Sequence, residues 1–254
     1  MKRPIAALLL AVPIVAAALS PAEVERIVRT VDERQRSQGD WKALAYMEAK
    51  EKDKTDVVYE LVVYRRGQDQ KLMFLFLEPK AEAGKGYLRI DKNLWFYDPG
   101  TGRWERRTER ERIGGTDTRR GDLDESRLAE EYDATWEADE KLGKFEVHRI
   151  LLKVKPGVDV AYPVVRLWID KASLNVLKRQ EMALSGRLMR TDLYPRWKKI
   201  YSESKKGDVW FPEQMYLYDE IEKANQTMIL IKSVDLRSLD ANLFTKAWLE
   251  SKSR

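Results

Sequence analysis

The chain has 254 residues, with 47 basic and 42 acidic side chains, one histidine and no cysteine. Without cysteine, a disulfide-stapled fold, a thiol enzyme, a cysteine-ligated zinc site and a lipid-modified N-terminal cysteine are all excluded. Charged residues make up 35% of the chain, while 43% are hydrophobic and 10% aromatic, which predicts a globular protein with a sizeable core and a charged surface. The net charge of +5 is a small difference between large numbers and only weakly favours acidic partners.

The first 18 residues have the pattern of a secretory signal peptide. Lys2 and Arg3 precede an apolar run at residues 5–19, and small residues before Ala18 provide a cleavage site after it. A transmembrane anchor is the alternative, but the run is shorter than the roughly 20 residues that span a bilayer, and Pro13 interrupts it. We therefore expect an exported, soluble periplasmic protein that is not lipidated.

The mature chain, residues 19–254, is expected to form a single domain that begins with a helix at residues 20–38. Its start has a serine N-cap, a proline at the first helical position and a glutamate at the capping-box spacing. An apolar stripe follows at helical spacing, made of Val24, Ile27, Val28 and Val31. No repeat, low-complexity tract or linker divides the remainder.

After this helix, short apolar runs separated by turns predict a mainly β fold. The expected strands are residues 41–50, 57–66, 71–78, 86–91, 93–97, 103–108, 145–155, 162–170, 176–184, 188–197, 209–220 and 227–236. About a dozen strands in sequential hairpins indicate an antiparallel sheet that curls or closes. Two short helices are also expected, one after the capping-box pair Asp122 and Glu125, and one after Asp240.

Several of these strands are apolar on both faces. Every position is apolar in residues 72–77 and 228–231, so neither face of these strands has the polar side chains of a solvent-exposed face. Three short helices provide little cover for such a sheet. Two explanations remain open: a closed and well-packed barrel or sandwich core, or a curved sheet whose concave side holds an apolar cavity for a hydrophobic ligand.

Residues suited to catalysis are scarce. His148 is the only histidine and is interpreted as a strand residue on a polar or cross-strand-paired face, because the usual partners of a triad or metal site are missing. The chain has no G-x-S-x-G elbow, no phosphate-binding glycine loop and no H-E-x-x-H motif. We therefore expect no enzymatic activity and no cofactor.

Two groups of charged residues are interpreted as ordinary surface features. The acidic group that starts at Asp117 and includes Asp122 lacks the spacing of a calcium loop, so it is interpreted as a solvated helix start rather than a metal site. The arginines between Arg103 and Arg120 alternate with glutamates. This favours paired or solvated charges over a nucleic-acid surface.

A series of short motifs occurs in order along the mature chain, at residues 93–99, 114–117, 122–123, 165–170, 210–212 and 243–245. Their order, together with the signal peptide and the N-terminal helix, resembles the LolA-like outer-membrane lipoprotein-sorting proteins over roughly residues 20–249. One departure is the basic stretch 118–121, where the family tends to have an aromatic and acidic one.

The resemblance implies a mainly β protein with a few short helices: a strongly curved antiparallel half-barrel with a helical lid over its concave face. It further implies a monomeric carrier that shelters the acyl chains of lipoproteins, or another lipidic ligand, and delivers them toward the outer membrane. An inner-membrane transporter and an outer-membrane acceptor are the implied partners. A sensor or adaptor domain working with an inner-membrane transporter is the alternative, and a secreted lipid-modifying enzyme is a third hypothesis.

Five strand residues are candidates for the cavity wall, namely Trp95, Tyr97, Trp168, Phe211 and Met215. Strand alternation leaves the face of each one open, and ordinary core packing is the alternative role. The resemblance adds a motif loop formed by Gly115, Thr116, Asp117 and Asp122.

The signal-peptide interpretation predicts the N-terminus of the exported protein. Cleavage after Ala18 leaves Leu19 as the first residue. N-terminal sequencing of protein recovered from the periplasm of an expressing Gram-negative host measures this directly. Exported protein that still begins at Met1 would contradict the prediction.

Overall fold

The computed structural model describes residues 18–36, 38–90, 93–107, 112–114, 116–118, 126–203 and 205–253. Within these residues, thirteen strands form one antiparallel sheet with the order β6-β5-β4-β3-β2-β1-β13-β12-β11-β10-β9-β8-β7. The strands are β1 (Trp41–Lys50), β2 (Val57–Arg66), β3 (Lys71–Glu78), β4 (Gly86–Ile90), β5 (Asn93–Asp98), β6 (Arg103–Arg107), β7 (Tyr132–Leu142), β8 (Phe145–Val154), β9 (Val164–Asp170), β10 (Val176–Met182), β11 (Leu188–Ser202), β12 (Gly207–Asp219) and β13 (Gln226–Asp235).

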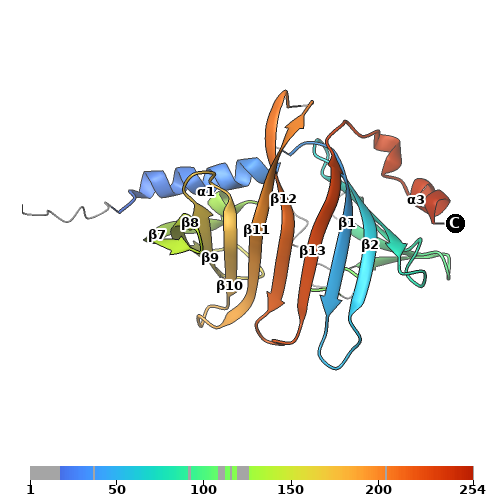
Figure 1. Ribbon diagram of the computed structural model, residues 1–254, viewed down its shortest axis with the longest axis horizontal. Coiled ribbons are helices and arrows are strands. Elements are labelled where there is room, and N and C mark those ends of the chain that lie inside the picture. Colours follow the sequence, from blue (N-terminus) through green and yellow to red (C-terminus); the bar gives the residue numbers. More distant parts are fainter. Residues whose placement is uncertain are drawn as a thin grey trace, which may run out of the picture.

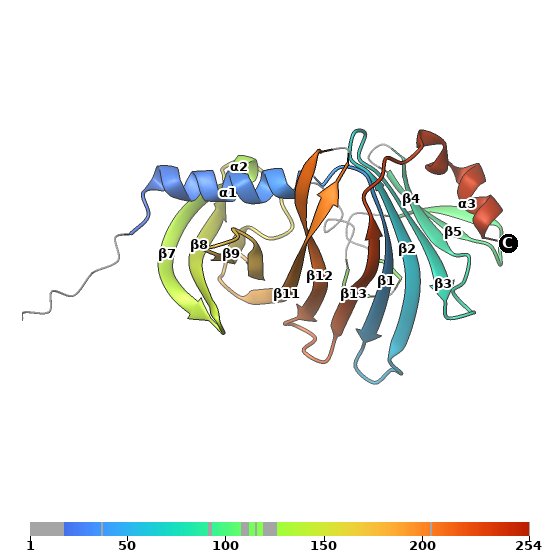
Figure 2. The same cartoon turned by 45° about the horizontal axis from the view of Figure 1, so that its top comes forward.

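The sheet consists of two meanders, β1 to β6 and β7 to β13, that are joined where the first strand pairs with the last. This ladder runs from Lys42 opposite Asp235 to Lys50 opposite Gln226, with one bulge. The two edges of the sheet are therefore β6 and β7. Both ends of the sheet bend to the same side, so that the sheet is open and curved (Figures 1 and 2). The predicted mainly β, curved antiparallel fold is confirmed.

The helices lie on different faces of this sheet. Helix α1 (Pro21–Arg36) and the single turn α2 (Leu128–Glu131) pack over β7 to β9, on the face that we call the inner face. The 3-10 helix η2 (Ala241–Leu243) and helix α3 (Lys246–Lys252) pack on the opposite, outer face near β4. No helix in the described part of the chain is long and apolar enough to cross a membrane.

Helix α1 forms for the reasons predicted from its sequence. The Ser20 backbone N–H donates to Glu23 Oε2 at 2.8 Å, which closes the expected capping box. The predicted stripe is buried, with Val24 and Val28 at 1% and 0% exposure, and packs against β8 and β9 through Ile150, Leu152, Val165 and Leu167. This stripe anchors α1 across one half of the inner face.

The C-terminal segment explains why the first meander is apolar on both faces. Phe244 and Leu249 pack over Met73 and Leu88 on the outer face. Gly86 permits this approach, because a Cβ there would lie 2.9 Å from a methyl carbon of Leu249 and 2.5 Å from a backbone oxygen. The outer apolar residues are therefore covered by the protein's own C-terminal segment rather than by a ligand.

The C-terminal helix and the second predicted helix differ from expectation. One helix was expected after Asp240, but the structure has two short helices there. Asp240 caps η2 with its side chain, and Thr245 caps α3 with its own. The capping pair Asp122 and Glu125 lies outside the described residues, and α2 begins only at Leu128. Residues 1–17 of the expected signal peptide also lie outside the described residues.

One strand, β7, was not predicted. Its sequence, YDATWEADEKL, is rich in acidic residues and lacks a continuous apolar run. Only Tyr132, Ala134 and Trp136 are directed at the cluster under α1, and a bulge after Trp136 then breaks the alternation. An edge strand needs one apolar stretch to be held in place, and charges elsewhere protect the edge from pairing with other chains.

Asp32 joins α1 to α2 and generates a prediction about stability. It is 3% exposed and accepts hydrogen bonds from the backbone N–H groups of Leu128 at 3.1 Å and Ala129 at 2.8 Å. Asp32→Ala would leave these donors unpaired, so we expect a loss of about 3 kcal/mol in the free energy of unfolding. Urea denaturation measures it, with the exposed neighbour Glu33→Ala as the matched control, expected to lose less than about 0.5 kcal/mol. Equal losses would contradict the role of Asp32.

Candidate ligand-binding face

The inner face carries two apolar clusters. Opposed residues on neighbouring strands share a face, and so do alternate residues of one strand. Such steps lead across the sheet from Met47 through Ile229, Met215, Leu217, Asp192 and Arg179 to Leu167. Leu167 belongs to the cluster under helix α1, which we call the α1 cluster. Met47 belongs to a second group, the β1–β5 cluster, formed mainly by Ala45, Met47, Tyr59, Leu61, Val63, Leu72, Phe74, Phe76, Tyr87 and Leu94.

A short segment lies on the β1–β5 cluster. This inner segment, residues 112–114 and 116–118, inserts Ile113, which is 2% exposed, among the aromatic residues of the cluster. The Tyr59 hydroxyl donates to the Gly114 carbonyl at 2.7 Å, and the Gly114 N–H donates to the Tyr87 hydroxyl at 3.0 Å. Gly114 has φ +59°, and a Cβ would lie 3.0 Å from the Phe76 ring. A glycine is therefore favoured here both by conformation and by space.

The described part of the predicted motif loop belongs to this inner segment. The Thr116 hydroxyl donates to the Ile113 carbonyl at 2.7 Å, and the Asp117 N–H donates to Thr227 Oγ1 on β13 at 2.8 Å. The interpretation of Asp117 as part of a solvated helix start is wrong, because this residue is only 6% exposed. Gly115 and Asp122 of the same loop lie outside the described residues.

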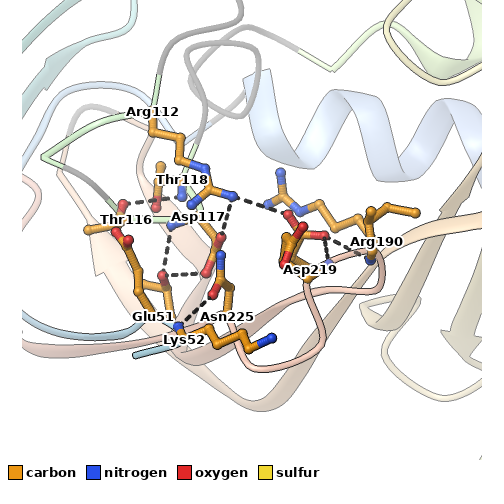
Figure 3. Close-up of polar contacts among 12 residues, drawn as sticks. Glu51, Lys52, Arg112, Thr116, Asp117, Thr118, Arg190, Asp219 and Asn225 are labelled. Atoms are coloured by element: carbon orange, nitrogen blue, oxygen red, sulfur yellow. Dashed lines mark hydrogen bonds and ion pairs between the residues drawn. The ribbon is translucent and has the colours of Figure 1, made fainter. Parts of the chain in front are cut away.

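A row of largely buried charges lies between the two apolar clusters. Figure 3 shows the part of it around Arg112, Asp117, Arg190 and Asp219. Arg112 of the inner segment lies 3.3 Å from Asp117 Oδ1 and 3.1 Å from Asp219 Oδ2 of β12. Arg190 of β11 is register partner to Asp219 and donates to Asp192 Oδ1 at 2.7 Å. We call this set the charged row; its members are Arg112, Asp117, Arg179, Glu181, Arg190, Asp192 and Asp219.

Burial sets the electrostatics of the row. Removal from water raises the pKa of Asp117 above its ordinary value, and the neighbouring Asp219 carboxylate acts in the same direction. The Arg112 guanidinium and the hydrogen bond from Thr227 oppose this rise without cancelling it. A cation beside Asp117 therefore lowers the free-energy cost of burying this carboxylate in its ionised form.

The five candidate wall residues lie on different faces. Phe211 and Met215 are on the inner face, where Phe211 contacts Trp41 with ring centroids 5.2 Å apart and Met215 opposes Ile229. The other three lie on the outer face: Trp95 and Tyr97 beside α3, and Trp168 in a small cluster with Val147 and Leu177. The charged row was not predicted from the sequence, because Arg179 and Glu181, like Arg190 and Asp192, occupy alternate strand positions and resemble a solvated face.

Two small hollows lie at the inner face. One hollow of about 50 Å³ is lined by Ala49, Glu51, Lys54, Thr55, Val57 and Tyr59. A second, lined by Asp117, Met189, Arg190 and Asp219, has no room for a water molecule, with a volume of about 0 Å³. Ligand pockets usually hold at least about 300 Å³. Neither hollow holds an alkyl chain as it stands, so a ligand at either one must displace side chains or the inner segment.

His148 has the cross-strand pairing expected from its sequence. Its Nδ1 lies 2.7 Å from Asp139 Oδ1, and the two residues are opposed in the β7–β8 ladder. Partial burial raises the pKa of Asp139, but hydrogen bonds from Lys171, Trp136 and His148 outweigh it and lower the pKa to about 2. The pair thus has a structural role in joining the edge strand β7 to β8.

This low pKa predicts acid sensitivity. Because the folded-state pKa of Asp139 is below its ordinary 3.8, the stabilisation is complete above about pH 4 and disappears as the pH falls through 2. Asp139→Asn should therefore cost roughly 2 kcal/mol of unfolding free energy at pH 7. Urea denaturation between pH 7 and pH 2 measures the gap between variant and parent. A gap that stays constant over this range would rule out the ionised Asp139 as its source.

Comparisons with known proteins show related sequences and folds. A family model described as "-like: Uncharacterized protein" matches residues 68–251. No curated protein matches the chain. A DUF1329 family protein from Desulfovibrio piger has a similar structure, with TM-score 0.77, 18% identity and coverage of 91% of this chain and 100% of the other.

Two further solved structures have the same fold. A putative outer membrane lipoprotein-sorting protein domain from Vibrio parahaemolyticus has TM-score 0.76 and 19% identity, and it covers 91% of this chain and 100% of its own. A LolA superfamily protein from Nitrosomonas europaea has TM-score 0.69 and 19% identity, with 92% and 100% coverage. At these identities the likeness establishes the fold.

Proposed function

Because this chain belongs to the LolA-like DUF1329 family, we propose that it is a periplasmic carrier for the acyl chains of lipoproteins or another lipid. It holds these chains against the β1–β5 cluster of the inner face and delivers them toward the outer membrane. Residues 1–18 direct its export, and residues 19–254 act as one monomeric lipid-binding domain without a cofactor or turnover.

The observation that carries this proposal is the unequal cover of the two apolar clusters. Helix α1 seals the α1 cluster through Val24, Ile27, Val28 and Val31, which makes that half of the inner face a permanent core. Among the described residues, the β1–β5 cluster is instead covered by the inner segment, which contributes Ile113. Segments held by a few contacts open more readily than packed helices. The β1–β5 cluster is therefore the half that can exchange its cover for an acyl chain.

The energy of binding comes from removing apolar surface from water. Each methylene moved from water to the cluster contributes about 0.8 kcal/mol, so a twelve-carbon chain supplies roughly 9 kcal/mol before the cost of opening the face and ordering the chain. Met215 extends the apolar surface toward the charged row, Phe211 extends it beside Trp41, and both contact the chain. Release then requires an apolar acceptor, which an outer-membrane receptor supplies, and loading requires a donor such as an inner-membrane transporter.

Adjacent residues on β13 test the proposal with a matched pair. Ile229 lies on the inner face opposite Met215 and Met47, whereas Leu230 lies on the outer face opposite Gln214 and Tyr46, and both are half-buried. Ile229→Ser should weaken binding of a fluorescent fatty-acid probe roughly tenfold, which corresponds to the loss of about two methylene contacts. Leu230→Ser should leave binding within about twofold of the parent while losing comparable stability.

Equal effects of the two substitutions, or no probe binding by the parent protein at any concentration, would contradict an inner-face acyl site. Salt provides a second check. Binding driven by apolar burial should change little between 50 and 500 mM salt, because burial of an alkyl chain forms no ion pair that salt could screen.

A further inference from the structure

We propose that the charged row contains a binding site for the primary ammonium group of an amphiphilic ligand, and that Arg112 occupies this site while no ligand is bound. The inference rests on the proposed function, since the ammonium would belong to a molecule whose alkyl chain lies on the β1–β5 cluster. It goes further by naming the chemistry of the ligand's polar end.

Two carboxylates form the centre of this site. Asp117 of the inner segment and Asp219 of β12 both face the guanidinium of Arg112, at 3.3 and 3.1 Å (Figure 3). Their side chains are only 7% and 10% exposed. Two acids this close and this buried need a positive group between them. The site therefore selects a cation.

Buried atoms without hydrogen-bond partners show which groups the row lacks. Among the described residues, Asp117 Oδ1 and Glu181 Oε2 are buried and make no hydrogen bond; each has only an ion pair, with Arg112 at 3.3 Å and with Arg190 at 3.9 Å. Their residues are 6% and 2% exposed, so bulk water does not supply the hydrogen bonds. Carboxylate oxygens can only accept hydrogen bonds. A ligand that completes the row must supply N–H or O–H donors, and an ammonium has three.

Two of the three arginines of the row hold other acids than Asp117 and Asp219. Arg190 and Arg179 are already committed to Asp192 and Glu181 at 2.7 and 2.6 Å.

Arg112 is the cation that can leave. It comes from the inner segment rather than from a strand, and its side chain is 31% exposed, against 4% for Arg190. The adjacent hollow, lined by Asp117, Met189, Arg190 and Asp219, has no room for a water molecule, with a volume of about 0 Å³. An ammonium must therefore replace the Arg112 guanidinium rather than bind beside it.

The position of the site suits an amphiphile. Thr227, which donates to Asp117 Oδ2, is opposed to Leu217 on β12, and the next inner-face pair along the two strands is Ile229 and Met215. Inner-face residues of one strand lie about 7 Å apart. An alkyl chain that starts from an ammonium at Asp117 would thus run directly onto the β1–β5 cluster through Ile229.

Amphiphiles with one chain length and different head groups test the inference. Dodecylammonium, dodecanol and dodecanoate would each displace the fluorescent fatty-acid probe from the full mature chain. In the parent protein we expect dodecylammonium to bind at least threefold more tightly than dodecanol, and dodecanoate to bind more weakly than both. Arg112→Gln removes the internal competitor, so the preference for ammonium over alcohol should rise at least tenfold.

Two further variants separate the site from general effects on folding. Asp219→Asn should reduce the preference for dodecylammonium over dodecanol to about one. Arg166→Gln is the matched control for Arg112→Gln, because Arg166 is 30% exposed and pairs with Glu137 at 2.7 Å on the outer face. The preference of this variant for dodecylammonium over dodecanol should equal that of the parent. Circular dichroism verifies that each variant is folded. If Arg112→Gln does not fold, the ammonium preference of Asp219→Asn tests the site alone.

The outcomes distinguish this inference from the proposed function. If the parent binds no amphiphile and no probe, the acyl site itself is absent. If it binds dodecanol and dodecylammonium equally, and Arg112→Gln and Asp219→Asn do not change their ratio, the acyl site stands and the ammonium site is overturned. Tight dodecanoate binding that disappears in Arg112→Gln would also overturn it, because Arg112 would then be a ligand for an anion.

Discussion

The pairing of β1 with β13 is the constraint on which the remaining structure depends. Nine opposed pairs, from Lys42 and Asp235 to Lys50 and Gln226, join the first and last strands and merge two meanders into one sheet. The connection between the edges β6 and β7 must then pass from one end of the curved sheet to the other. Residues of this connection, Ile113 and Arg112, consequently lie on the inner face, where one fills an apolar cluster and the other bridges two buried acids.

The inner face combines two kinds of interaction in one surface. The β1–β5 cluster favours any apolar chain in proportion to the area it covers, which gives affinity without selectivity. The charged row is costly to bury and adds selectivity, because a head group that leaves Asp117 or Asp219 without a cation loses part of the binding energy that its alkyl chain supplies. A carrier built in this way would bind through the alkyl chain and discriminate through the polar end.

Most of the sheet was predictable, because its strands alternate or are continuously apolar between clear turns. Strands β1, β2 and β3 match their predicted bounds, whereas β7 was missed because Glu137, Asp139 and Glu140 conceal its short apolar stretch. The candidate site was less predictable. Trp95 and Met215 belong to similar patterns but lie on opposite faces, which only the pairing of strands reveals. Arg190 and Asp192 resemble solvated strand charges until β10 and β12 are placed beside them.

Methyl NMR of the methionines would test the inner-face account most directly. Met47 belongs to the β1–β5 cluster and Met215 lies beside it on the inner face, while Met73 lies on the outer face under the C-terminal segment. Titration of ¹³C-methyl-methionine protein with a dodecyl amphiphile should shift the resonances of Met47 and Met215 and leave that of Met73 in place. Shifts confined to Met73, or saturating binding with no shift at Met47 or Met215, would contradict an acyl site on this face.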